Sequence, residues 1–276
     1  MSKNLVTCQW LNEHMDDKKI RILDCRFELG KPNAGFEAYL ADHIPNAIYV
    51  DLEKDMSSPV RDHGGRHPLP DLEDFSAKLG AIGIDETMTV VAYDDQGGAM
   101  ASRLWWLLKY VGHNDVYVLG TSYSNWKNNG YEITTMIPHF DQTNFNMVLN
   151  EKMLSTVEDV RASIHNEEVI LIDSRERLRY LGIEEPIDKK AGHIPSAKNY
   201  FWKDVLNENG EWKKREEQKE RFKGIEQNKK IIVYCGSGVT ACPNVLCLQS
   251  LGYENVKLYL GSWSDWISYN ENEIEK

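Results

Sequence analysis

Short runs of apolar and β-branched residues alternate along the chain with longer amphipathic stretches. Apolar runs of four or five residues, bounded by turn residues, are typical of buried strands. The stretch 99–111 repeats its leucines at helical spacing and predicts a helix. This alternation indicates an α/β fold in which helices flank a mostly parallel sheet. The predicted strands are Arg21–Asp24, Thr89–Tyr93, Val116–Leu119, Val169–Asp173, Lys230–Tyr234 and Val256–Tyr259.

The pattern occurs twice, which indicates a duplicated domain. Asp24 and Arg26 in the first half correspond to Asp173 and Arg175 in the second, a shift of 149 residues from Asp24 to Asp173. Three further matches follow in the same order at similar shifts. They are the His-Ile-Pro segments at His43 and His193, the strand ends at Asp94 and Cys235, and the Leu-Gly pairs Leu119-Gly120 and Leu260-Gly261.

A chain of 276 residues has room for two such domains. The segment 138–150 is polar and rich in turn-forming residues, so we expect a linker there. The first domain is then expected over 1–137 and the second over 151–276. An apolar content of 41% and a charged content of 27% are globular values, and no apolar run has the length of a membrane span.

Charge and cysteine usage restrict the partners. A net charge of −11 argues against nucleic-acid binding, and an anionic substrate must be held by local donors. Five scattered cysteines form no disulfide framework, and the N-terminus lacks the apolar core of a signal peptide, so a cytoplasmic location is expected. No cysteine and histidine spacing suits zinc, and we expect no metal, cofactor or membrane partner.

Cys235 is the candidate nucleophile. It ends the predicted strand Lys230–Tyr234 and precedes a Gly-Ser-Gly turn and a helix start. In parallel sheets, ligands lie beyond the C-terminal ends of the strands. Turn amides and the positive end of a helix favour a thiolate there. The alternative interpretation is a buried structural cysteine.

The loop after Cys235 is the candidate substrate-binding segment. Two of its residues are glycines, which allow backbone angles and close approaches that a Cβ would hinder. Two others carry hydroxyl groups, which either donate to the sulfur or serve in turn and helix-cap bonds. The candidate loop residues are Gly236, Ser237, Gly238, Val239 and Thr240.

Nearly the whole chain resembles the rhodanese-like sulfurtransferases with two tandem rhodanese domains. The resemblance implies that the second domain is catalytic and that the first, with Asp94 in place of a cysteine, is silent. The loop 235–241 is similar to that of 3-mercaptopyruvate sulfurtransferases, since thiosulfate sulfurtransferases usually carry basic residues at positions 236 and 237. The motifs that carry the resemblance are the paired Asp-x-Arg and His-Ile-Pro segments, Gly-Arg-His-Pro-Leu-Pro at 65–70, Tyr-Asp-Asp-Gln-Gly-Gly at 93–98 and Gly-Ser-Trp at 261–263.

The implied reaction is sulfur transfer through a persulfide on Cys235. The donor expected from the loop is 3-mercaptopyruvate, with thiosulfate as the alternative. The acceptor is a thiophile such as a small thiol, a thioredoxin-like protein or cyanide. A non-catalytic rhodanese-like binding or regulatory module is a further alternative.

The resemblance also implies roles for residues outside the loop. Arg179 matches an arginine that binds the donor's anionic end, although a surface ion pair is the alternative. Ser237 is expected to act with His67 and Glu53 in a relay, and a loop hydrogen bond is the alternative for His67. Mercaptopyruvate enzymes usually carry a second arginine where this chain has Ile187, which weakens the donor assignment.

Residues that recur in both halves are interpreted as structural, because the silent half keeps them too. They are the Asp-Arg pairs and the two histidines of the His-Ile-Pro segments. Cys242 and Cys247 are expected to pack in a helix core, with a redox role as the alternative. Cys8 and Cys25 are expected to be inert.

Two other enzyme classes fit the loop poorly. Residues 236–241 match a dinucleotide-binding pattern, Gly-x-Gly-x-x-Ala, but only 38 residues follow Gly238 in a chain of 276, too few for a nucleotide domain. A cysteine-dependent phosphatase needs an arginine where this chain has Ala241.

Overall fold

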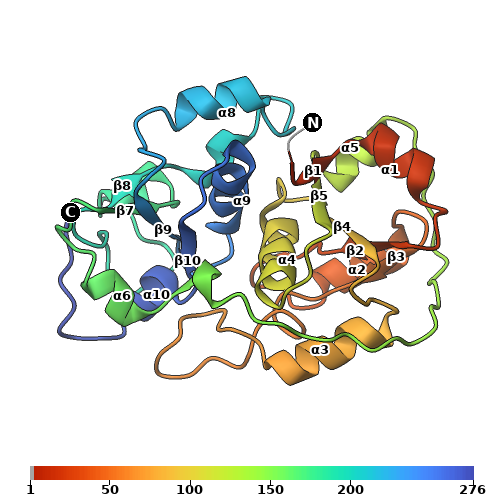
Figure 1. The fold of residues 1–276 in the computed structure, drawn as a ribbon, viewed down its shortest axis with the longest axis horizontal. Helices are drawn as coiled ribbons and strands as arrows, with labels where there is room; N and C mark the ends of the chain where they lie inside the picture. The colour runs from red at the N-terminus through yellow and green to blue at the C-terminus, as the bar shows by residue number, and fades with distance from the viewer. Residues whose placement is uncertain (1–2) are drawn as a thin grey trace. The chain divides into compact units, whose positions relative to one another are not determined.

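A computed structural model describes residues 3–276. It divides into two compact units, each built on its own sheet (Figure 1). Most of the first unit comes from the first half of the chain and most of the second unit from the second half. Each unit also includes one segment from the other half. The segment 59–69, here the first arm, belongs to the second unit, and the segment 206–212, here the second arm, belongs to the first unit.

The first sheet has five parallel strands in the order β1-β5-β4-β2-β3. Its central strands, β2 and β4, are buried on both faces, which explains why most of their residues are apolar; Arg21 and Asp24 of β2 are the buried charged exceptions. The strands are β1 (Leu5–Val6), β2 (Ile20–Asp24), β3 (Ala47–Tyr49), β4 (Thr89–Tyr93) and β5 (Val116–Leu119).

The second sheet repeats this order as β6-β10-β9-β7-β8, again with parallel pairing. The identical order in both units confirms the duplication and the α/β class that the sequence predicts. The strands are β6 (Leu154–Ser155), β7 (Val169–Asp173), β8 (Lys198–Asn199), β9 (Lys230–Tyr234) and β10 (Val256–Tyr259).

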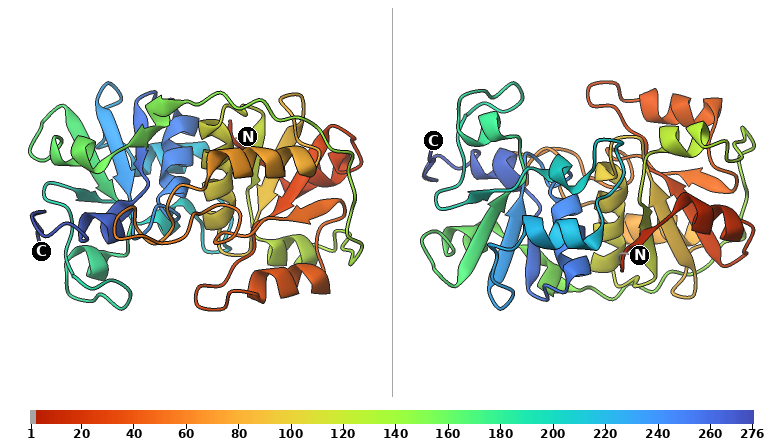
Figure 2. Two further views of the ribbon diagram at one scale, coloured as in Figure 1. Left: turned by 90° about the horizontal axis from the view of Figure 1, so that it is seen from below. Right: turned by 90° about the horizontal axis from the view of Figure 1, so that it is seen from above.

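Helices cover both faces of the first sheet. Leu11 and Trp126 pack with Ile22 and Val91 of the strands on one face. Figure 2 shows α3 and α4 on one side of this sheet and α2 and α5 on the other. The helices are α1 (Cys8–His14), α2 (Ala34–Ala41), α3 (Leu72–Ala81), α4 (Ala99–Tyr110) and α5 (Tyr123–Asn128).

The second unit is built in the same way. Val160 and Trp266 pack against Leu171 and Ile232 on one face of the sheet, and α9 packs on β9 and β10. The charged run 213–221 contains the mostly exposed helix Arg215–Arg221. The helices are α6 (Val157–Arg161), α7 (Arg177–Tyr180), α8 (Arg215–Arg221), α9 (Cys242–Leu251) and α10 (Ser262–Trp266), with 3₁₀ turns at Glu151–Met153 and Trp202–Val205.

The repeated charged and histidine residues are structural, as predicted. Arg26 and Arg175 hold Asp24 and Asp173 through pairs of 2.7 and 2.6 Å, and all four side chains are buried. The rings of both His-Ile-Pro histidines bond to backbone oxygens. His43 Nδ1 is 2.7 Å from Tyr39 O, and His193 Nδ1 is 2.8 Å from Tyr180 O.

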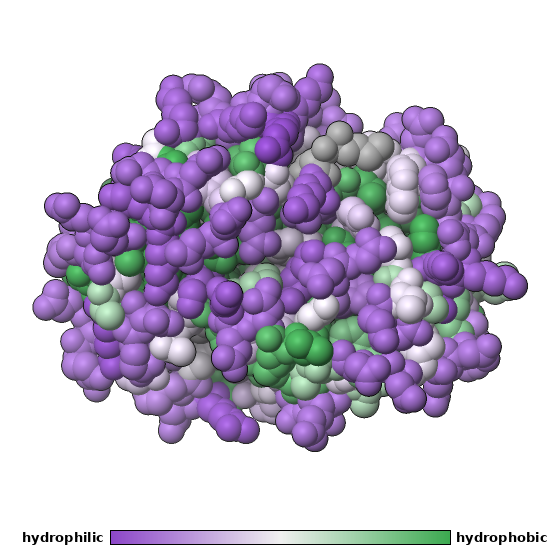
Figure 3. Space-filling model, in the orientation of Figure 1, coloured by the Kyte–Doolittle hydropathy of each residue, from purple (hydrophilic) through white to green (hydrophobic). Residues whose placement is uncertain are grey.

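The segment 138–150 forms no helix or strand and belongs to the first unit. The N–H of Thr143 donates to Gly80 O at 2.9 Å, and that of Val148 donates to Val111 O at 3.0 Å. On the face seen in Figure 3, hydrophilic residues predominate and hydrophobic ones form small separate patches. Among residues 3–276, no helix combines the length and apolar character needed to cross a membrane.

Candidate active site

Cys235 follows β9 directly and is 1% exposed. Its backbone is held from two sides, since Cys235 N donates to Ser262 Oγ at 3.1 Å and Cys235 O accepts from Trp263 N at 2.9 Å. Ser262 has a φ of +56°, an unusual conformation for a residue with a Cβ, and its hydroxyl donates to Tyr259 O at 2.8 Å. Sequence reasoning missed this support for the candidate nucleophile, although it singled out the Gly-Ser-Trp segment.

The backbone conformation and surroundings require a glycine at position 238, whereas at position 236 only the end of an arginine side chain lies close. A Cβ on Gly238, whose φ is +75°, would lie 2.1 Å from Leu260 O. A Cβ on Gly236 would lie 2.9 Å from Arg66 Nη2. The helix-cap alternative for Thr240 is wrong, because α9 starts at Cys242 and its N-cap residue is Ala241.

The loop of the first unit shows what such a loop binds. Asp94, at the cysteine position, is 1% exposed, and its carboxylate accepts four backbone N–H bonds of 2.8 to 3.0 Å. Burial raises the pKa of Asp94, and the four amides act against this rise. The loop thus surrounds an anionic group with amides. The donors are Gln96, Gly98, Met100 and Ala101, which correspond in register to Ser237, Val239, Ala241 and Cys242.

The first arm brings His67 to the loop of the second unit. His67 Nδ1 lies 2.8 Å from Ser237 Oγ, and both residues are buried. The arm is fixed by backbone N–H bonds, from Gly64 to Asp265 Oδ1 at 2.7 Å and from Arg66 to Ser264 Oγ at 3.1 Å. The two members of the predicted relay that lie in this unit are therefore in contact.

Arg179 lies on α7 beside the loop. Its Nη2 donates to Glu185 Oε1 at 2.7 Å and to Asp188 Oδ2 at 3.0 Å, and its Nε bonds to both oxygens of Glu185. Its Nη1 and Nη2 lie 3.7 and 3.6 Å from the Cβ position of Gly236. Arg179 does form ion pairs, as the alternative expects, but they lie beside the loop and its side chain is only 15% exposed.

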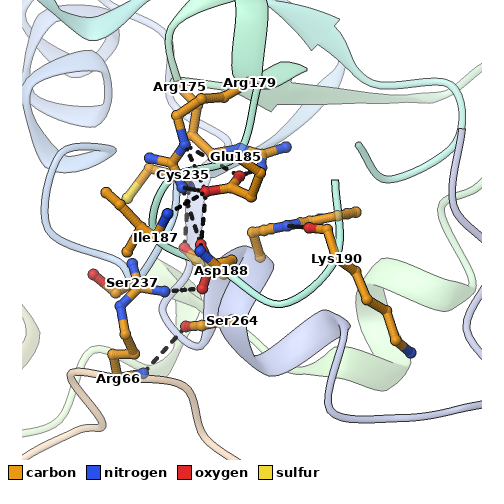
Figure 4. Close-up of polar contacts among 12 residues, drawn as sticks. Arg66, Arg175, Arg179, Glu185, Ile187, Asp188, Lys190, Cys235, Ser237 and Ser264 are labelled. Carbon is orange, nitrogen blue, oxygen red and sulfur yellow. Dashed lines mark hydrogen bonds and ion pairs between the residues drawn. The ribbon is translucent and has the colours of Figure 1, made fainter. Parts of the chain in front are cut away.

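A second guanidinium meets Gly236, and it comes from Arg66 (Figure 4). Its Nη1 pairs with Asp188 Oδ1, and its Nη2 faces the loop. Ile187 stands where the second arginine was expected, and Arg66 from the first arm is a second arginine beside the loop. Arg66 is the sequence neighbour of His67, which the sequence analysis singled out. Arg66 itself was not singled out, because its pairing with Asp188 joins residues 122 positions apart. The side chain of nearby Lys190 points away from the cluster.

The acidic residues of this cluster have opposite pKa shifts. Burial disfavours the charge of Glu185, but Arg179 and backbone amides outweigh it and hold the pKa of Glu185 below its ordinary value. Burial raises the pKa of Asp188, and the nearby Glu185 adds to the rise, while Arg66, Arg179 and Arg175 act against it. Sequence reasoning missed Glu185 and Asp188 as site residues.

The remaining candidates lie elsewhere or are inert. Glu53 belongs to the first unit, is exposed, and donates its N–H to Asp51 Oδ1 at 2.8 Å. Burial raises the pKa of Cys8 to about 11 and of Cys247 to about 12, and it raises that of Cys25 as well. These thiols are therefore protonated at neutral pH. Across residues 3–276, no group of three or more His, Cys, Asp or Glu side chains has the arrangement of a metal site.

Comparison with known proteins identifies the family. The model of the rhodanese-like domain matches residues 7–129 and 156–269, so the chain belongs to the rhodanese family with two such domains. It is 38% identical to a probable 3-mercaptopyruvate sulfurtransferase of Pseudomonas aeruginosa, over 97% of this chain and 96% of the relative. It is 32% identical to the thiosulfate sulfurtransferase of Bos taurus, over 95% of this chain and 91% of the relative.

A solved structure agrees with this placement. The crystal structure of a 3-mercaptopyruvate sulfotransferase from Escherichia coli matches with a TM-score of 0.82 and 32% identity. The match covers 94% of this chain and 98% of that chain.

Proposed function

We propose that this protein transfers a sulfur atom from 3-mercaptopyruvate to a thiophilic acceptor through a persulfide on Cys235. The observation that carries the proposal is the convergence of Arg66 and Arg179 on Gly236, the residue next to the nucleophile. Two guanidinium groups at this point suit the carboxylate of an α-keto acid. The relatives from Pseudomonas aeruginosa and Escherichia coli bear the corresponding name and support the same donor.

The reaction proceeds in two displacements. The Cys235 thiolate attacks the donor sulfur, an S–S bond forms, and the C–S bond breaks with its electron pair leaving on C3 as pyruvate enolate. The acceptor then attacks the outer sulfur of the persulfide and releases the Cys235 thiolate. By analogy with the Asp94 loop, amides of the second loop stabilise the thiolate and the persulfide anion.

The enolate needs a proton at C3, and the Ser237–His67 pair is placed to move it. Glu53 remains the predicted acid of this relay. The first domain has Asp94 where the nucleophile would stand, and its carboxylate already occupies the ring of amides. We therefore propose that this domain is catalytically silent.

Thiosulfate is the second candidate donor. Two guanidinium groups also suit a sulfonate, and the Bos taurus relative is named for thiosulfate. In that case the S–S bond of the donor breaks and sulfite leaves, with no proton needed at carbon.

Steady-state sulfur transfer to cyanide tests the proposal, with both donors and with Cys235→Ala. We expect a higher kcat/KM with 3-mercaptopyruvate and no transfer by the variant. Mass spectrometry should find one added sulfur atom on Cys235 after the donor step. Equal rates in the variant would remove Cys235 as the nucleophile, and a thiosulfate preference would favour the second candidate. No transfer from either donor would favour a binding or regulatory module.

A further inference from the structure

Asp188 lies between the two guanidinium groups that the proposed function gives to the donor (Figure 4). Its Oδ1 accepts from Arg66 Nη1, and its Oδ2 accepts from Arg179 Nη2 at 3.0 Å. The side chain is only 4% exposed, so water screens these pairs weakly. The carboxylate thus uses the same two donors that an α-keto acid carboxylate or a sulfonate would need.

We propose that Asp188 is a built-in competitor of the donor, whose anionic group must displace this carboxylate from Arg66 and Arg179. Asp188 then sets which anions gain access to Cys235. The proposal rests on the proposed function of the two arginines. It predicts that an anion displaces Asp188 only if it binds both guanidinium groups. Carboxylates and sulfonates can do this through two oxygens, whereas halides cannot.

The neighbouring Glu185 is anchored in a way that Asp188 is not. Glu185 accepts from Arg179 Nε and Nη2, from Arg175 Nη1, and from the backbone N–H groups of Ile187 and Asp188. Among residues 3–276, the Asp188 carboxylate has hydrogen bonds only to the two arginines. Release of Asp188 therefore breaks no bond to the backbone, whereas release of Glu185 would break two.

Arg66 has a donor available for a new ligand. Within the described chain its Nε is buried without a hydrogen-bond partner, and its Nη2 faces Gly236. Buried donors without partners cost free energy, so an anion that reaches this guanidinium gains more than a simple exchange of partners.

The charged groups that face Asp188 are Arg66 from the first arm, Arg179 from α7, Arg175 after β7, and Glu185 from its own loop.

A falling pH should weaken the hold of Asp188 on the two arginines before it weakens the ion pairs of Glu185. The pKa of Asp188 is raised and that of Glu185 is lowered, so a falling pH neutralises Asp188 first. A neutral Asp188 no longer competes, and anion affinity should rise. The two proteins differ only at position 188, so the difference between them at each pH reports on Asp188.

The test measures pyruvate and thiosulfate binding by calorimetry in the Cys235→Ala protein, with and without Asp188→Asn. We expect the added substitution to lower both Kd values about tenfold, because a competing state no longer holds the site. It should also flatten the rise of affinity with acid. Asp62→Asn is the matched control, since it removes one negative charge from an exposed residue of the same arm. The control should leave both Kd values unchanged.

Weaker binding after Asp188→Asn would overturn the proposal and make Asp188 a residue that positions the arginines. No binding of either anion by either protein would also overturn it. Thermal melting checks that the Asp188→Asn variant folds. If it does not fold, the same measurements are made with Asp188→Ala. Sulfur transfer by the unmodified protein judges the proposed function separately, since these binding measurements need no turnover.

Discussion

His67 Nδ1 and Ser237 Oγ are 2.8 Å apart although 170 residues separate them in the chain. The contact exists because the first arm packs in the second unit, where its backbone bonds to Ser264 and Asp265. A buried hydroxyl and imidazole at this distance can move a proton, which the 3-mercaptopyruvate reaction needs and the thiosulfate reaction does not.

Ser237→Ala should therefore slow sulfur transfer from 3-mercaptopyruvate much more than transfer from thiosulfate. We expect kcat with 3-mercaptopyruvate to fall about a hundredfold, because the hydroxyl that would pass the proton to pyruvate C3 is removed. Transfer from thiosulfate should change much less and serves as the internal control. Equal losses with both donors would show that Ser237 shapes the loop and does not transfer a proton.

Gly238→Ala should destabilise the second unit by about 3 kcal/mol, because a Cβ meets Leu260 O and the φ is positive. Gly252→Ala is the matched control, since Gly252 also has a positive φ but open space around its Cβ position. The control should lose only about 1 kcal/mol. Urea unfolding of both variants measures the difference, and equal losses would contradict the clash.

Glu185→Gln should destabilise the protein in a pH-dependent way. The folded-state pKa of Glu185 is lowered, so its charge stabilises the fold above the ordinary glutamate range and this contribution is lost as the pH falls through the lowered value. We expect a loss of about 2 kcal/mol at pH 7 that shrinks toward zero in acid. Urea unfolding across the pH range tests this, and a constant loss would argue against the ion pair with Arg179.

Asp94→Asn should destabilise the first unit by about 2 kcal/mol. One amide NH₂ would face two backbone N–H donors that now meet a carboxylate oxygen. The variant should keep its sulfur transfer per folded molecule, because Cys235 lies in the other unit. Urea unfolding and the cyanide assay measure the two properties, and a loss of activity at full stability would give Asp94 a part in the reaction.

The sequence predicts the central strands to within one residue, since each is an apolar run buried on both faces. It does not predict β1, β3, β6 or β8, which have two or three residues and show no periodicity. Cys235 could be predicted as the nucleophile because its strand, turn and helix are local in the sequence. Arg66 and Asp188 could not, because their pairing depends on the path of the first arm across 122 residues.

The exchange of arms works in both directions. The second arm returns to the first unit, where Trp212 N donates to Gly120 O at 3.0 Å, at the position where the first arm meets Gly261 in the second unit. The first half of the chain therefore supplies Arg66 and His67 to the surroundings of the Cys235 loop in the second unit. Because each unit contains a segment from the other half of the chain, a division of the gene between its halves would remove one arm from each unit.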